Sequence, residues 1–150
     1  MALVRAADEP VLKEGLWSIH TETTSQPGGK KTVGNRSLCR SHAYDQEVRA
    51  RAKAQAPDCK TIVDKSDGAK WENETECVIA GTTTHSKSTV TRAGENAVHS
   101  ETHATYNPPL GGVAEMSMAM DQKYVGACPA GVDPGDSIGA DGKVMKARKR

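Results

Sequence analysis

The sequence predicts a mainly β fold: a curved antiparallel sheet, or a small open β-barrel, of about seven strands with one helix and disulfide staples. Three observations predict this class. Polar and apolar residues alternate in short segments bounded by Gly, Pro, Asp and Asn, which is typical of half-buried strands. The chain has no Phe and only 3% aromatic residues, so a helical core is hard to build. Four cysteines form an even set in a small, polar chain.

The clearest alternation lies in segment 71–79. Trp71, Asn73, Thr75, Cys77 and Ile79 fall on one side, and Glu72, Glu74 and Glu76 fall on the other. A second strand is expected over 59–63, with turn chemistry in 64–68 between the two. Folding the chain about Gly68 places Cys59 opposite Cys77, so we predict a hairpin closed by a cross-strand disulfide.

The remaining elements follow from the same patterns. Further strands are expected over 14–24, 31–39, 81–90, 95–106 and 113–128. Ser41 is suited to cap a helix that carries Tyr44 and Val48 and runs to Ala54, and the Pro-containing segment 56–58 ends it. The Pro- and Gly-rich segment 107–112 is expected to interrupt the strand ladder. The order predicts two strands, one helix and then five strands in meander.

At 150 residues the chain is expected to form one domain. We expect a loose lead-in over 1–13, a β-rich domain over 14–128, and an irregular basic tail over 129–150. By elimination, Cys39 pairs with Cys128. This bond closes a loop of about ninety residues, which the loop-entropy model values at roughly 4–5 kcal/mol.

Charge and cysteine usage restrict the class of protein. Lys and Arg number 20 against 19 Asp and Glu, a balance that argues against a nucleic-acid partner. No apolar run is long enough to span a bilayer. The cysteines form no CxxC pair, which disfavours structural zinc and favours disulfides made in an oxidising compartment, with four reduced thiols in the cytosol as the alternative. The start lacks a signal peptide, and we interpret the chain as a mature or trimmed export product, periplasmic or secreted.

Several short motifs, in order, resemble a known family. They are Gly15-Leu-Trp17, Leu38-Cys39, a later cysteine pair, and a closing Tyr124-Val-Gly-Ala-Cys128. From about Gly15 to Cys128 the chain resembles the bacterial proteins called domain of unknown function 3617. The resemblance implies an exported, β-rich, disulfide-bonded protein, and it implies no catalytic residue because the family has no established activity.

Two patterns suggest metal ligands. Met116, Met118 and Met120 alternate, so their thioethers leave one face of a strand, as Cu(I) would require, and His20, His99 or His103 could complete the site. His99, Glu101 and His103 also share a strand face and could hold a harder metal. The alternatives are that the methionines fill the core and that the polar residues form a solvated face.

No pattern indicates catalysis. The chain has no Gly-x-Ser-x-Gly motif, and oxidised cysteines cannot act as nucleophiles. We therefore expect no enzyme. Trp17, Trp71 and Tyr44 are candidates to line a ligand cavity, or else to anchor the core.

The sequence thus favours an exported, non-catalytic binding or interaction module of the bacterial cell envelope. One alternative is a periplasmic copper-binding protein that uses the methionine strand, with copper as its only candidate cofactor. The other is a self-assembling subunit of a ring or filament. Thr-rich strands over 81–106 could pair between copies, or the basic tail could meet the acidic face of Glu72, Glu74 and Glu76.

Overall fold

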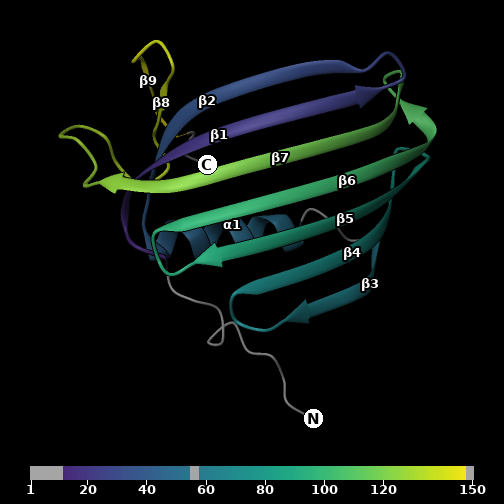
Figure 1. Ribbon diagram of the computed structural model, residues 1–150, viewed down its shortest axis with the longest axis horizontal. Coiled ribbons are helices and arrows are strands. Elements are labelled where there is room, and N and C mark those ends of the chain that lie inside the picture. Colours follow the sequence, from purple (N-terminus) through teal and green to yellow (C-terminus); the bar gives the residue numbers. More distant parts are fainter. Residues whose placement is uncertain (1–11, 55–57, 148–150) are drawn as a thin grey trace.

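The computed structural model describes residues 12–54 and 58–147, and in this part of the chain a large antiparallel sheet carries one helix on one side (Figure 1). The long strands are β1 (Gly15–Gln26), β2 (Lys30–Arg40), β3 (Cys59–Ser66), β4 (Lys70–Ile79), β5 (Thr82–Ala93), β6 (Ala97–Leu110) and β7 (Val113–Gly126). The helix is α1 (His42–Ala54), and two short strands are β8 (Ser137–Gly139) and β9 (Val144–Met145).

The strand order is β3-β4-β5-β6-β7-β1-β2-β8-β9. Strands β3 to β7 form a meander, and the β1–β2 hairpin adds to β7, so the first strand of the chain lies in the middle of the sheet. The sheet is curved and its two outermost strands do not pair, so it is an open sheet and not a closed barrel (Figure 1). This confirms the predicted fold class.

Both predicted disulfides are present. Cys59 and Cys77 are direct cross-strand partners, with their Cα atoms 4.1 Å apart. Cys39 and Cys128 join the end of β2 to the segment after β7, with 5.7 Å between their Cα atoms. The first bond closes the β3–β4 hairpin at the edge of the sheet, and the second connects segments 89 residues apart.

The two faces of the sheet differ in character. We call the face on the side of α1 the helix face. It carries Trp17, Ile19, Leu38 and the methionines of β7. These residues share one face because each is a direct cross-strand partner of another residue on that face, or lies two positions along its strand from such a partner. Its centre is well packed, since Trp17 is 0% exposed and Ile19 is 3% exposed. The opposite face, the histidine face, carries His20, His85, His99 and His103.

The C-terminal segment differs from the predicted irregular tail. Residues 137–139 form β8 on the outer side of β2, and β8 pairs with β9. The carboxylate of Asp136 is buried and accepts hydrogen bonds from Lys146 Nζ at 2.8 Å and from the backbone N–H of Ala147 at 2.8 Å. The backbone of Cys39 also bonds to Asp136 and Gly135. Composition suggested a loop, yet one buried carboxylate fixes the segment to β2.

The predicted lead-in also has a structural role at its end. Residues 1–11 lie outside the described part of the chain, but the carbonyl of Lys13 accepts a 2.9 Å hydrogen bond from Trp17 Nε1. The N–H of Lys13 donates to the carbonyl of Glu95 in the β5–β6 turn. Lys13 therefore joins the core tryptophan to a neighbouring hairpin.

The structure changes the basis for self-assembly. Strands β5 and β6, which the sequence offered as pairing edges, each have a neighbour on both sides. The two edges of the sheet are β3 and the short β9, and β8 covers only Arg36–Leu38 of β2. The long edge strand β3 carries a bulge near Ile62 together with charged residues such as Lys60 and Lys65. Charged side chains and bulges on an edge strand oppose strand addition. Lys146 of the tail is paired with Asp136 of the same chain.

The start of β1 requires glycine. Gly15 has a φ of +143°, and a Cβ there would collide with the carbonyl oxygen of Gly126 and lie 2.7 Å from Tyr124 Cε2. The β1–β7 register shifts just beyond this point, between Leu16 and Trp17. The close approach of the two strands is therefore possible only without a side chain at position 15.

We predict that Gly15→Ala destabilises the protein by at least about 2 kcal/mol, because it adds backbone strain to a collision with β7. Gly126→Ala, with a φ of +144° and nothing within 4 Å of its added Cβ, should cost less, since it meets strain alone. Gly34→Ala, at ordinary φ in open space, should be nearly neutral. Urea unfolding of the three variants measures this order, and equal stability of Gly15→Ala and Gly34→Ala would refute the close-approach argument.

We predict that Asp136→Asn loosens segment 129–147 at neutral pH. Hydrogen bonds, first from Lys146 and then from backbone N–H groups, lower the pKa of Asp136 from its ordinary 3.8 to about 2. The stabilisation is therefore present above about pH 4 and is lost as the pH falls through about 2. The difference in free energy of unfolding between wild type and Asp136→Asn, measured with urea, should narrow as the pH falls from about 4 to about 2.

The matched control is Asp133→Asn. The side chain of Asp133 is 82% exposed and lies 3.8 Å from Lys146, so its loss should change little. A gap between wild type and Asp136→Asn that stays constant from neutral pH to about pH 2 would contradict the assigned role of the Asp136 charge.

Candidate functional site

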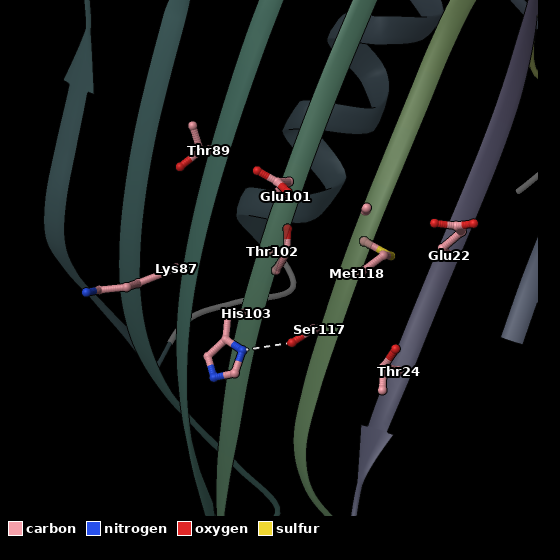
Figure 2. A pocket seen from close by; sticks show the side chains of 10 residues that line it. Glu22, Thr24, Lys87, Thr89, Glu101, Thr102, His103, Ser117 and Met118 are labelled. Atoms are coloured by element: carbon pink, nitrogen blue, oxygen red, sulfur yellow. Dashed lines mark hydrogen bonds between the residues drawn. The ribbon is translucent and has the colours of Figure 1, made fainter. Parts of the chain in front are cut away.

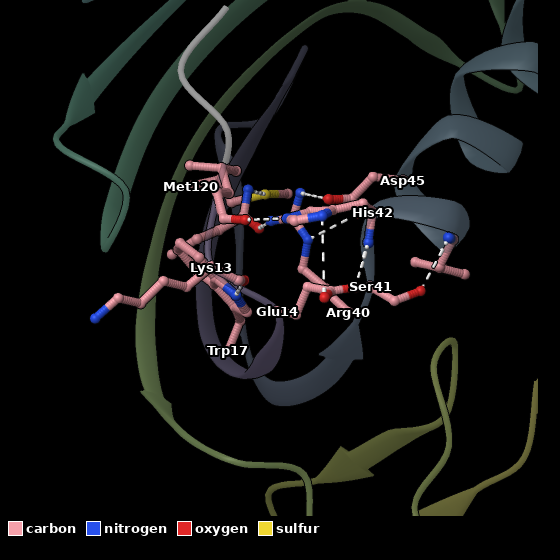
Figure 3. Close-up of polar contacts among 11 residues, drawn as sticks. Lys13, Glu14, Trp17, Arg40, Ser41, His42, Asp45 and Met120 are labelled. Carbon is pink, nitrogen blue, oxygen red and sulfur yellow. Dashed lines mark hydrogen bonds and ion pairs between the residues drawn. The ribbon is translucent and has the colours of Figure 1, made fainter.

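Helix α1 is fixed to the sheet by a polar cluster at its first turn (Figure 3). Ser41 caps the helix, as predicted, because its Oγ accepts a 3.1 Å hydrogen bond from the N–H of Tyr44. Arg40 donates two hydrogen bonds to the Asp45 carboxylate, at 3.0 and 3.1 Å, and a third to Gln122 Oε1 at 3.0 Å. The Arg40 guanidinium also lies 5.1 Å from the centre of the Trp17 ring. Arg40 thus connects β2, α1, β7 and the core.

A cavity of about 310 Å³ lies between α1 and the helix face. Its lining residues come from β1, β2, α1 and β7: Ile19, Arg36, Leu38, Arg40, Tyr44, Asp45, Val48, Arg49, Met120 and Gln122. This volume falls at the lower end of the range for small-molecule sites, about 300–1,000 Å³. The cavity is therefore large enough for a small ligand.

The lining combines apolar and charged groups. Ile19, Leu38 and Met120 supply the sheet side, and Val48 supplies the helix side. The charged groups are three guanidiniums and one carboxylate, and that carboxylate, Asp45, is held by two bonds from Arg40. The cavity thus joins an apolar surface to an excess of positive charge.

The structure brings one of the three predicted cavity aromatics to this site. Tyr44 lines the cavity. Trp17 instead anchors the core, where its ring makes an edge contact with Tyr124 at 6.2 Å between centroids. Trp71 lies at the β3–β4 hairpin and donates a 2.7 Å hydrogen bond to Asp64.

Sequence reasoning missed two arginines of the lining, Arg36 and Arg49. Arg36 alternates with Leu38 on β2, and Arg49 stands four residues after Asp45 on α1. Strand alternation and helical spacing each signal a shared face. The sequence does not show that this face of β2 and this face of α1 line the same cavity.

The histidine face is a row of imidazole–carboxylate pairs. His99 Nδ1 lies 2.6 Å from Asp121 Oδ1, and His85 Nε2 lies 2.6 Å from Glu74 Oε1. His103 contacts Ser117 Oγ at 2.9 Å and Glu115 at 2.8 Å. The predicted acidic strand face, which includes Glu74, is therefore part of this surface, and Lys70 pairs with Glu72 there at 3.2 Å.

A shallow groove of about 430 Å³ crosses the histidine face (Figure 2). Figure 2 shows Glu22 on β1 and Glu101 on β6, with β7 between them. The small side chain of Ala119 is the cross-strand partner of both glutamates, which leaves room between the two carboxylates. The residues that line this groove include His103, Lys87 and the two glutamates.

The predicted copper site is not assembled. His99 pairs with Asp121 and His103 pairs with Ser117, so both point away from the face that carries Met116, Met118 and Met120. His20, which pairs with Asp121 on the other side, also lies on the histidine face. The methionines occupy even-numbered positions of β7, whereas all three histidines pair with odd-numbered positions of β7, so the two sets stand on opposite faces.

The harder-metal site over His99, Glu101 and His103 is not formed either. In residues 12–54 and 58–147, no three His, Cys, Asp or Glu side chains are grouped to hold a metal ion. His99 engages Asp121 and His103 engages Ser117, so each turns to a separate partner on β7.

A comparison with protein families decides the assignment. The family model described as "Protein of unknown function (DUF3617)" matches residues 12–128, which is most of the chain. The chain belongs to the DUF3617 family. No curated protein matches the chain.

The resemblance noted in the sequence is confirmed by this match. In this DUF3617 protein the opening motif and the closing motif lie side by side, because Gly15 abuts Gly126 and Trp17 pairs with Tyr124. Cys128 then bonds to Cys39, beside Arg40. The motifs that carry the resemblance therefore build the structural node beneath the cavity.

We predict that His20 and His99 titrate above their ordinary pKa of 6.5. A hydrogen bond to Asn35, then one to Glu22, raises the pKa of His20, and a hydrogen bond to Asp121 raises the pKa of His99. The stabilisation from the charged imidazoles is complete below about pH 6.5 and is lost as the pH rises through the folded-state pKa values. NMR titration of the imidazole protons measures the pKa values of both histidines.

Asp121→Asn provides the discriminating variant. It should lower the pKa of His99 more than that of His20, since Asp121 is the hydrogen-bond partner of His99 and only a coulombic neighbour of His20. Asn35→Ala should lower the pKa of His20 alone. An unchanged His99 midpoint in Asp121→Asn would show that the pair does not form in solution.

Proposed function

We propose that this chain is an exported, non-catalytic binding module of the bacterial cell envelope that holds a small ligand between α1 and the sheet. The observation that carries the proposal is the cavity of about 310 Å³, with its apolar sheet side and its guanidinium groups. Binding sites are typically concave, mostly apolar and equipped with a few polar groups that orient the ligand.

The composition of the lining supports binding without catalysis. Among the described residues, the lining contains no histidine, cysteine, serine or threonine that could serve as a base or nucleophile. Its carboxylate, Asp45, is occupied by Arg40. All four cysteines are oxidised.

The disulfides support export. Disulfides persist in oxidising compartments and are rare in the cytosol, and this chain uses both of its bonds as staples for a small core. Helix α1 has 13 residues, and the described part of the chain holds no helix long and apolar enough to cross a membrane.

Self-assembly into a ring or filament stays a prediction from the sequence. Its two proposed contacts are altered, because β5 and β6 are interior strands and Lys146 is paired within the chain. The cavity provides a more specific basis for function than either contact.

We predict that small fragments bind in the cavity and shift the NMR signals of Tyr44, Leu38 and Met120. Val48→Trp should abolish these shifts, since Val48 lines the cavity, is 41% exposed, and offers room for a larger ring that fills the space. Val78→Trp is the matched control, because Val78 is 52% exposed on β4 and does not line the cavity. Shifts that persist in Val48→Trp, or that scatter over the sheet, would argue against a binding module at this site.

A further inference from the structure

Arg36 is the unusual group of the helix–sheet cavity. It lies on β2 directly opposite Ile19, with β8 on its other side, and its side chain lines the cavity. Within residues 12–54 and 58–147 no hydrogen bond or ion pair engages its guanidinium, although neighbouring Arg40 makes three. A cation facing a cavity without a carboxylate partner is suited to an anionic ligand.

The remainder of the lining selects for an apolar body. Ile19 is 3% exposed and forms the deep sheet side together with Leu38 and Met120, and Val48 faces them from α1. A ligand that fills this surface removes its apolar area from water, which is the main source of affinity for such groups. The small volume restricts that body to a short chain.

The charge balance selects the sign of the head group. The one carboxylate of the lining is neutralised by Arg40, so an anion meets no unpaired negative charge there. A cationic head would meet the guanidiniums of Arg36, Arg40 and Arg49. Like charges at short range would oppose its binding.

We propose that the cavity binds a short-chain carboxylate amphiphile, with its alkyl chain against Ile19, Leu38 and Met120 and its carboxylate on Arg36. This assignment rests on the proposed binding function and names its ligand class. Arginine suits the head group because its planar donors match both oxygens of a carboxylate and stay charged at any physiological pH.

Titration calorimetry with octanoate, kept below its critical micelle concentration, and with the uncharged 1-octanol tests the assignment on the disulfide-intact protein. Octanoate should bind at least about tenfold more tightly than 1-octanol, the difference expected of one charge-assisted hydrogen-bond pair. Arg36→Gln should remove most of that difference and leave 1-octanol unchanged. Lys31→Gln, the same charge change on the opposite face of β2, should leave both dissociation constants unchanged.

The outcomes separate the two proposals. Equal binding of octanoate and 1-octanol, or an unchanged octanoate constant in Arg36→Gln, would overturn the anion assignment. Absence of octanoate binding would also overturn the anion assignment. If the fragment-induced NMR shifts still vanish in Val48→Trp, the proposed binding module would remain supported. Octanoate binding that survives Val48→Trp would place the ligand elsewhere and overturn the inference. Circular dichroism of each variant verifies that it is folded.

Discussion

The stack of Arg40 on Trp17 is the interaction on which the rest of the structure depends. Trp17 is fully buried in a chain without Phe, and it contacts β7 through Tyr124 and the preceding segment through its bond to Lys13. Arg40 covers the ring and extends the same node to α1 and β7 by way of Asp45 and Gln122. The Arg40 side chain is only 15% exposed, so leaving its guanidinium without these partners would be costly. This cluster therefore fixes where the helix lies and hence the width of the cavity beside it.

A disulfide bond and the contacts of a buried carboxylate connect further segments of the chain to this cluster, where there are few apolar contacts. The Cys39–Cys128 bond begins one residue before Arg40 and ties the chain after β7 to β2. Asp136 then fixes the last described segment to the backbone of Cys39. The family match ends at residue 128, so Asp136 lies beyond it, while Trp17, the contact between Gly15 and Gly126, and both disulfides lie within it. The contacts that position α1 therefore fall inside the matched residues.

Prediction from the sequence succeeded where neighbours in the chain are neighbours in space. Alternation about Gly68 was sufficient to place Cys59 opposite Cys77, and Ser41 was sufficient to begin the helix. It failed where distant strands meet. Whether Met118 shares a face with His103 depends on the β6–β7 register, in which a shift of one residue exchanges the faces. The β1–β7 pairing and the binding of the tail to β2 likewise depend on contacts that no local pattern encodes.

The sheet separates two kinds of charge, and this separation has a functional consequence. On the histidine face, the hydrogen bond to Asn35 raises the pKa of His20 and the hydrogen bond to Asp121 raises the pKa of His99, so these two imidazoles gain charge as the pH falls. In the cavity the cations are arginines, a residue type that proteins keep protonated. Strand alternation puts a full backbone layer between the two sets. Acidification therefore makes the outer surface more positive through His20 and His99 and adds no charge to the guanidiniums of the cavity. A carboxylate ligand would meet the same guanidinium across the range in which those two histidines titrate.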